Sequence, residues 1–193
     1  MNGSAQPPAT LRNEHAAGRL ERVLIDERSL HDRVRELGAE ITADFEGRDL
    51  VVVCLLKGGI YFAVDLTRAI DLPITLEFVR ARSYAGTAST GRVELVWIEG
   101  LDVQGRDVLL VEDIVDTGIT LIEVWRALAA RRPATLSLCT LLYKEKLLAH
   151  PFPIRYIGFG IEDVFVVGYG LDFDERFRNL PHIAVFQPYA PAG

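Results

Sequence analysis

The segment 108–120 constrains the fold of this chain more than any other part of the sequence. It begins with a continuous apolar stretch, Val-Leu-Leu-Val at 108–111, which is followed by Glu112 and Asp113 and then by Asp-Thr-Gly-Ile-Thr at 116–120. A strand that is apolar at every position is typical of a parallel sheet covered on both faces. The segment therefore predicts an α/β fold that delivers polar residues to the carboxyl end of a strand, where open α/β sheets bind ligands.

The rest of the chain alternates between strand and helix patterns. Leu30, Val34, Leu37, Ile41 and Phe45 recur at spacings of three and four, which indicates an amphipathic helix over residues 29–45. Strand followed by helix and strand is a crossover unit, so we expect a parallel twisted sheet core flanked by helices. The further strands are predicted at 49–56, 74–79, 93–98, 107–111 and 134–143, and the further helices at 60–70 and 121–130.

The two ends of the chain differ from this pattern. Residues 1–18 are polar and hold no apolar run long enough for a signal peptide, so we expect a flexible arm that does not export the chain. Residues 19–193 are expected to form one domain. Short strands predicted at 154–159, 164–169 and 183–186 are interrupted by prolines and glycines, so residues 147–193 are predicted to supply most of a small hood subdomain.

Composition excludes several classes of protein. The net charge of −6 argues against a surface that grips nucleic acid nonspecifically, because that affinity comes from many Lys and Arg contacts. No stretch reaches the ~20 apolar residues needed to span a membrane. Cys54 and Cys139 each lie in an apolar run, which favours buried free thiols and a reducing cytoplasm. Because the cysteines and histidines lack zinc-ligand spacing, a bound metal would be a hard ion such as magnesium, held by carboxylates.

The polar half of segment 108–120 suits a phosphorylated sugar. Backbone N–H groups at a helix N-terminus bind phosphate, and Thr117 and Thr120 add hydroxyl donors. Glu112 and Asp113 would repel a bare phosphate, but they can accept hydrogen bonds from sugar hydroxyls or bind magnesium. An acidic strand end and an ordinary capped helix would explain each part alone, but not the assembled segment.

This segment resembles the phosphoribosyl-diphosphate signature of the type I phosphoribosyltransferases. Residues 55–59, Leu-Leu-Lys-Gly-Gly, resemble the pyrophosphate loop of that family, and Ser83-Tyr84 with Ser-Thr-Gly at 89–91 resemble its flexible active-site loop. Residues 164–172 with Phe177-Arg178 resemble the base-binding hood of its hypoxanthine-guanine members. The resemblance covers about 30–186 and implies the type I phosphoribosyltransferase fold.

The resemblance also implies a reaction. It is the magnesium-dependent transfer of a 5-phosphoribosyl group from 5-phospho-α-D-ribose 1-diphosphate, hereafter the donor, to N9 of hypoxanthine or guanine. The products are the nucleotide, IMP or GMP, and pyrophosphate. The partners expected are therefore small molecules, with no nucleic acid and no membrane, and a homodimer or homotetramer is expected from exposed apolar residues such as Tyr61-Phe62.

The resemblance assigns a role to individual residues. Asp116 would exchange a proton with N7 of the purine, Lys144 would donate to O6, Phe165 would stack on the ring, and Val166 would contact its edge. Each residue also has an ordinary alternative: Asp116 as a helix N-cap, Lys144 as a surface lysine, and the apolar pair Phe165-Val166 as core. The donor would contact Lys57, Gly58, Glu112, Asp113, Asp116, Thr117, Gly118, Ile119, Thr120 and Arg178; Asp172 would lie beside the base; Ser83 and Tyr84 would close over the site; and the magnesium ligands would be Glu112, Asp113 and Asp172.

Two further points concern the pocket and its substrate. The peptide bond between Leu56 and Lys57 can be cis in the family, and Lys144 is followed by Glu145-Lys146-Leu147, where many relatives have a basic residue or proline. The sequence leaves the choice among hypoxanthine, guanine and xanthine open. Two alternatives remain: a transferase for a pyrimidine such as uracil, and a non-catalytic regulator that senses the donor and binds nucleic acid.

Overall fold

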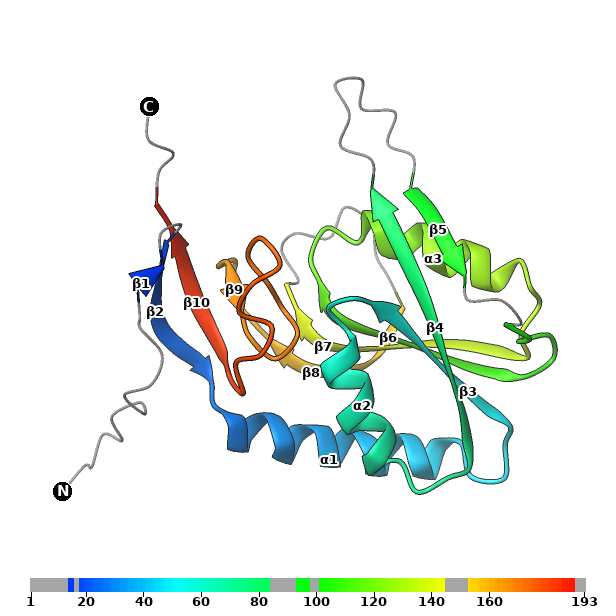
Figure 1. Ribbon diagram of the computed structural model, residues 1–193. Helices are drawn as coiled ribbons and strands as arrows, with labels where there is room; N and C mark the ends of the chain where they lie inside the picture. Colours follow the sequence, from blue (N-terminus) through cyan, green and yellow to red (C-terminus); the bar gives the residue numbers. More distant parts are fainter. Residues whose placement is uncertain (1–13, 16–17, 84–92, 98–100, 145–152, 190–193) are drawn as a thin grey trace.

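The computed structural model describes residues 14–15, 18–83, 93–97, 101–144 and 153–189. They form a six-stranded sheet with helices on both faces and a four-stranded sheet at one end (Figure 1). The larger sheet has the order β5-β4-β3-β6-β7-β8, and all its strands are parallel except β5. Its strands are β3 (Leu50–Leu56), β4 (Ile74–Ser83), β5 (Val93–Trp97), β6 (Asp107–Val115), β7 (Thr135–Tyr143) and β8 (Ile154–Gly160).

Alternate residues of the central strands divide the core into two layers. Val52 and Cys54 of β3 lie in the layer beneath α1 (Glu27–Asp44) and α2 (Ile60–Ala69). Val51 and Val53 lie in the opposite layer, beneath α3 (Ile119–Ala129). Because both faces are covered, the central strands are apolar throughout, as the sequence predicts. Cys54 and Cys139 are buried and free, and burial raises the pKa of the Cys54 thiol to about 12.

The predicted helices are confirmed with small shifts of their ends. Helix α1 begins after Asp26, whose carboxylate accepts a hydrogen bond from the Ser29 N–H at 2.9 Å. This cap lies earlier than the apolar stripe, so the helix starts at Glu27 and not at residue 29. Helices α2 and α3 begin at Ile60 and Ile119 and end close to their predicted ends.

Two strands run further than the apolar pattern predicts. Strand β4 continues to Ser83 because β5 pairs with it antiparallel from Val79 onward. The predicted flexible loop that contains Ser83 and Tyr84 therefore begins in a strand, and residues 84–92 lie outside the described residues. Strand β6 continues past the acid pair to Val115 because β7 keeps pairing with it, with Glu112 opposite Thr140.

The smaller sheet, together with the residues on either side of β9 (164–165 and 168–182), is here called the hood. The sheet differs from the prediction in two strands. It consists of β1 (Glu14–His15), β2 (Gly18–Ile25), β10 (Ile183–Pro188) and β9 (Val166–Val167), in that order. The prediction that 154–159 belongs to the hood is wrong, since β8 pairs parallel with β7 in the main sheet. Residues near the N-terminus supply β2 instead, and it pairs antiparallel with β10.

The hood is held over the main sheet by packing and by hydrogen bonds, one of which comes from Tyr169. Val167, Leu180 and Phe186 form its own small core. The hydroxyl of Tyr169 donates to the Asp65 carboxylate of α2 at 2.6 Å. This contact fixes the loop after β9 above the end of β3. Within the described part of the chain, no helix is long and apolar enough to cross a membrane.

Candidate active site

The candidate site lies where β3 ends and β6 continues. The last β3–β6 pair is Cys54 with Val111, and beyond it β6 keeps only its pairing with β7. The departure of β3 leaves a pocket of about 270 Å³ at the carboxyl ends of the strands. Its lining comes from the ends of β3, β4 and β6, from the loops that follow β3 and β6, and from the start of α3: Leu55, Leu56, Gly58, Ala81, Glu112, Ile114, Val115, Asp116, Thr117, Gly118, Ile119, Thr120 and Leu121.

The acid pair of β6 is buried at this pocket. The Asp113 N–H donates to the Glu112 carboxylate at 3.1 Å, and the Ile114 N–H donates to Asp113 Oδ1 at 2.8 Å. Burial, together with the nearby charge of Asp113, raises the pKa of the Glu112 carboxyl well above its usual value. Hydroxyl donors of a sugar or a bound cation would stabilise the charged form, so the pair is suited to either ligand.

The loop between β3 and α2 packs closely on the acid pair. The Leu56–Lys57 peptide bond is cis, as the resemblance implies. A Cβ placed on Gly58 would lie 1.6 Å from Asp113 Oδ2. A Cβ placed on Gly170 of the hood, where φ is +102°, would lie 2.2 Å from the Gly58 carbonyl oxygen. Only glycine fits at either position, and the two glycines bring the loop, the acid pair and the hood together.

The loop between β6 and α3 leaves its amides without a side-chain cap. The N-cap residue of α3 is Gly118, with φ 75°, and no side chain caps the helix. The alternative of Asp116 as N-cap is therefore wrong. Ile119 points outward, with 59% of its surface exposed. Because the first N–H groups of a helix lack intrahelical partners, this loop can bind an oxyanion.

Lys144 lies beside Asp116. Only 7% of Lys144 is exposed, so the alternative of a surface lysine is wrong. Its amine lies 3.7 Å from Asp116 Oδ2 and 3.3 Å from Asp163 Oδ1. The other carboxylate oxygen of Asp116 is buried and has no hydrogen-bond partner among the described residues. An unpaired buried acceptor of this kind is costly, and a proton-bearing ligand atom would satisfy it.

Phe165 presents an apolar surface in the hood, and the core alternative holds only for the buried Val166. The Phe165 ring is 47% exposed, and it packs edge-on against Phe173 with the ring centroids 5.8 Å apart. The alternative of a core phenylalanine is therefore wrong, and an exposed face remains for stacking. Val166 is buried in β9, opposite Val185 of β10.

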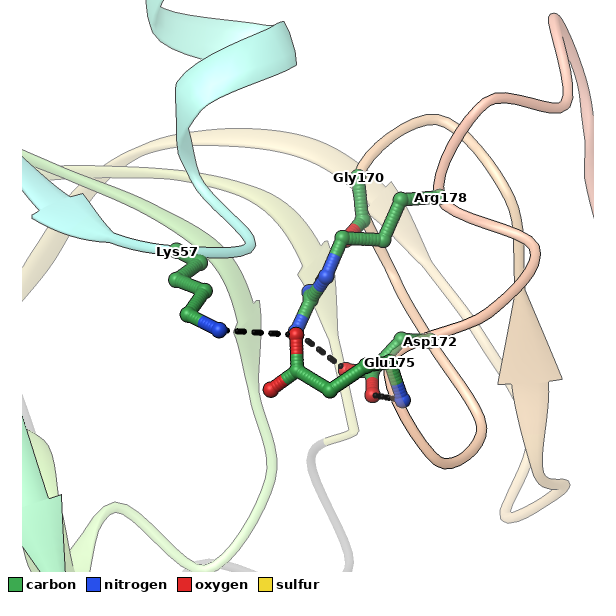
Figure 2. A network of polar contacts seen from close by, with 5 residues as sticks. All are labelled: Lys57, Gly170, Asp172, Glu175 and Arg178. Carbon is green, nitrogen blue, oxygen red and sulfur yellow. Dashed lines mark hydrogen bonds and ion pairs between the residues drawn. The ribbon is translucent and has the colours of Figure 1, made fainter.

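Asp172 and Arg178 form an ion pair that closes the other side of the site. Arg178 lies 2.9 Å from Asp172 Oδ1 and donates to the Gly170 carbonyl at 2.7 Å (Figure 2). Asp172 Oδ2 accepts from the Glu175 N–H at 2.8 Å. Both residues are partly buried, so they are not freely solvated surface charges.

The acids of the site fit a metal only in part. No group of three metal-ligating side chains gathers in the part of the chain that the structure describes. The expected set of Glu112, Asp113 and Asp172 is thus not brought together, and both Asp172 oxygens have partners already. The buried pair Glu112 and Asp113 does fit Mg²⁺, which usually binds one or two carboxylates and takes its other ligands from water and substrate phosphates.

Sequence reasoning missed two charged residues near the site, and some of the residues that it named lie outside the described residues. Asp163 pairs with Lys144, and Glu175 pairs with Lys57 at 2.8 Å. An acid in a loop gives no signal of its own, although Glu175 lies three residues before Arg178. Ser83 is the last residue of β4. Tyr84 and the segment Glu145-Lys146-Leu147 lie outside the described residues.

A larger hollow, of about 930 Å³, lies between α1 and α2. Its charged side chains largely pair with one another: Arg28 and Arg35 both contact Asp32. It holds none of the residues of segment 108–120. The smaller pocket at the end of β6 is therefore the candidate active site.

Comparison with known proteins agrees with this geometry. The chain is 43% identical over 178 residues to the hypoxanthine-guanine phosphoribosyltransferase of Mycobacterium avium. These aligned residues cover 89% of this chain and 88% of that protein. It is 39% identical to the hypoxanthine-guanine-xanthine phosphoribosyltransferase of Tritrichomonas foetus, over 87% of this chain and 92% of that protein. The crystal structure of a hypoxanthine phosphoribosyltransferase from Staphylococcus aureus matches with a TM-score of 0.82 at 40% identity, covering 87% of this chain and 92% of that one.

The family signature extends over most of the described fold. The phosphoribosyl transferase domain matches residues 25–174, from the end of β2 to the loop after β9. That range contains the acid pair, both loops of the pocket and Lys144. The chain belongs to the phosphoribosyl transferase domain family and has the type I phosphoribosyltransferase fold.

Proposed function

We propose that this protein is a purine-salvage enzyme that transfers a 5-phosphoribosyl group from the donor to N9 of hypoxanthine or guanine and releases pyrophosphate. One observation carries the proposal. A buried acid pair, an uncapped amide loop and the Lys144–Asp116 pair meet at the end of β6. These three parts suit the ribose, the phosphate and the base of a nucleotide, in that order.

The donor is held by both loops of the pocket. The amides and hydroxyls of Asp116, Thr117, Gly118, Ile119 and Thr120 bind the 5-phosphate at the positive end of α3. Glu112 and Asp113 accept hydrogen bonds from the ribose hydroxyls. On the other side, the pyrophosphate group contacts Lys57, Gly58 and Arg178, where the guanidinium offers paired donors to phosphate oxygens.

The base enters beneath the hood. Phe165 offers an exposed ring face for stacking, and Val166 and Asp172 line the side nearest the 2-position. Lys144 donates to O6, and Asp116 exchanges a proton with N7 through its unpartnered carboxylate oxygen. Both Asp116 and Lys144 are held by the strand ends of β6 and β7, since the Lys144 N–H donates to the Val115 carbonyl at 3.0 Å.

Charge is the remaining requirement of the reaction. Mg²⁺ bound with Glu112 and Asp113 would neutralise the diphosphate and so make pyrophosphate a better leaving group. Lys57 and Arg178 add positive charge at the same end of the donor. The loop that contains Ser83 and Tyr84 is proposed to exclude water from the ribosyl centre, because the donor would otherwise be hydrolysed.

A second substrate has a specific observation in its favour. The Tritrichomonas foetus relative is named for xanthine as well as hypoxanthine and guanine, so xanthine is the second candidate base. Uracil fits less well, because a small pyrimidine does not present the protonated N7 and the O6 acceptor that Asp116 and Lys144 would contact together. A donor-sensing regulator would not need a buried lysine beside Asp116.

The proposal includes an assembly and a compartment. The expectation that Phe62 is exposed is wrong, since Phe62 is buried in the core. Ile60, Tyr61 and Val64 instead form an exposed apolar face on α2, which supports a homodimer or homotetramer. The two free cysteines support a reducing compartment such as the cytoplasm. Residues 1–18 are proposed as an arm and 19–193 as the single domain, although β1 and the start of β2 already pair within residues 14–18.

One assay tests the proposed function. The protein is incubated with Mg²⁺, the donor and one of hypoxanthine, guanine, xanthine or uracil, and the nucleotide formed is identified by mass spectrometry. We expect IMP or GMP. Formation of UMP alone would move the enzyme to the pyrimidine class, and donor binding with no nucleotide from any base would favour the regulator.

A further inference from the structure

The carboxylate of Glu175 pairs with Lys57 and Arg178, the two cations that are proposed to bind pyrophosphate. Its carboxylate Oε2 lies 2.8 Å from the Lys57 amine and 3.3 Å from the Arg178 guanidinium (Figure 2). Lys57 belongs to the loop after β3 and Arg178 to the hood, so this one carboxylate bridges the two parts of the protein that face each other across the site. Nothing in the proposed reaction uses it.

The backbone around Glu175 is shaped for its side chain. Phe173 and Arg176 exchange backbone hydrogen bonds of 3.2 and 3.1 Å, which encloses a two-residue turn. Its central residues, Asp174 and Glu175, have φ of 52° and 61°, the arrangement of a type I′ turn. Asn-Gly is the usual sequence of such a turn, and a glutamate at positive φ is uncommon. A residue kept in an unfavourable backbone conformation points to a role for its side chain.

The charge of Glu175 matches the ligand that it would replace. The hydrogen bond from Lys57 lowers the pKa of the Glu175 carboxyl, so it is an anion at neutral pH. The Glu175 N–H donates to Asp172, which in turn holds Arg178. The carboxylate is therefore placed as a phosphate oxygen would be, between a lysine and an arginine, and its side chain is 62% exposed to solvent.

We propose that Glu175 is an internal placeholder for pyrophosphate: it pairs with Lys57 and Arg178 in the empty site, and the diphosphate of the donor must displace it. This inference rests on the proposed function. Two consequences follow for the same reaction. The placeholder weakens the binding of the diphosphate, and it helps pyrophosphate to leave by taking back both cations after the transfer. Glu175 is thus a positioning residue and touches no reacting atom.

The test compares variants by titrating inorganic pyrophosphate with Mg²⁺ into the full chain in a calorimeter. Glu175→Gln removes the charge and keeps the shape, so we expect pyrophosphate to bind about two- to tenfold more tightly, given the usual strength of exposed ion pairs. Glu175→Asp keeps the charge but shortens the side chain, and we expect it to tighten binding as well, because the carboxylate no longer reaches both cations.

Asp174→Asn is the matched control. It removes one negative charge from the same turn, and Asp174 has no ion pair with Lys57 or Arg178 among the contacts of the described residues. We expect its pyrophosphate affinity to stay within about twofold of the parent. The kinetic readout is a matched fall in the donor KM and in the inhibition constant of pyrophosphate for Glu175→Gln, with an unchanged KM for the base.

The outcomes separate this inference from the proposed function. If the parent makes nucleotide and binds pyrophosphate, but Glu175→Gln binds it no more tightly, the placeholder is overturned and the function stands. Equal tightening in Asp174→Asn would also overturn it, because general charge would then explain the effect. If the parent makes nucleotide but neither it nor the variants bind pyrophosphate, only the placeholder is overturned. If the parent also makes no nucleotide, both proposals are wrong.

Discussion

The amine of Lys144 lies 3.7 Å from the Oδ2 atom of Asp116. O6, an acceptor, and N7, which can carry a proton in the free base, are neighbouring atoms on one edge of a 6-oxopurine. A lysine donor and a carboxylate acceptor this close can therefore contact both atoms of one base at once. The pairing also gives the buried Lys144 amine a carboxylate partner before any base binds. The geometry therefore links substrate recognition and proton exchange in one unit.

Replacing Lys144 with alanine tests the recognition half of that unit. Loss of a charge-assisted hydrogen bond to O6 should lower kcat/KM for hypoxanthine or guanine by about 10- to 150-fold, while donor affinity stays within about twofold. Steady-state kinetics and donor calorimetry measure the two effects. Asp163→Asn is the control, since it removes the other ion pair of Lys144 and should change kcat/KM little. Equal losses for donor and base would assign Lys144 a structural role.

Replacing Asp116 with asparagine tests the proton-exchange half. The loop amides remain in place, so donor binding should be nearly unchanged. The rate of the chemical step should fall by about 10² to 10⁴-fold, the usual worth of acid–base assistance. Single-turnover kinetics beside donor calorimetry make the comparison. A variant as fast as the parent would remove Asp116 from the mechanism.

Gly58→Ala tests the packing of the pyrophosphate loop on the acid pair. The new Cβ would lie 1.6 Å from Asp113 Oδ2, and the buried carboxylate has little room to move. We expect a loss of about 1 to 3 kcal/mol in the free energy of unfolding, typical of overpacking. Gly160→Ala, with no atom within 4 Å of its Cβ, is the control and should be neutral.

A double variant identifies the cause of that loss. Gly58→Ala combined with Asp113→Ala removes the clash, so stability measured by urea unfolding should recover, whereas donor binding should not. If stability stays low, the backbone of the loop and not the Asp113 carboxylate is responsible.

Glu112→Gln tests the electrostatics of the pocket through pH. Burial raises the pKa of Glu112 above its ordinary value of 4.5. At pH values above 4.5 the unfolded chain therefore releases the proton of this carboxyl, whereas the folded protein keeps it. The parent therefore loses stability as pH rises from that value through the raised pKa, by up to about 1.4 kcal/mol per pH unit. The glutamine variant should lack this loss and be more stable than the parent at neutral pH.

Urea unfolding at a series of pH values from 4 upward measures this difference. Glu46→Gln, which alters an exposed carboxylate after α1, should follow the parent at every pH. Parallel curves for the parent and Glu112→Gln would show that folding leaves the pKa of Glu112 unchanged, which contradicts the raised pKa.

The sequence predicts elements well where local pattern decides them. The stripe from Leu30 to Phe45 predicts α1, and the apolar run before Lys57 predicts β3, because one face or both faces of each must be buried. Strand ends are different. Strand β6 continues through two acids only because β7 remains beside it, and a partner from another part of the chain leaves no local mark.

The same distinction applies to the site: parts built from consecutive residues are predicted, and parts that need distant residues are not. Segment 108–120 predicts the acid pair and the amide loop, since consecutive residues build both. The burial of Lys144 is not visible in its Lys-Glu-Lys setting, because Asp116 and Asp163 come to it only in three dimensions. The ion pair between Asp172 and Arg178 also forms only in three dimensions. Because of it, Asp172 does not join the expected metal ligands Glu112 and Asp113.

The pairing of β2 with β10 has a consequence for biosynthesis. Arg19 and Gln187 share a hydrogen bond of 3.0 Å although they are 168 positions apart, so one strand of the hood is translated early and the other late. All the strands of the α/β sheet leave the ribosome before β10 does. The sheet that carries the acid pair can thus fold during translation while β2 still lacks its partner β10. The hood sheet that covers the base site is completed after the larger sheet.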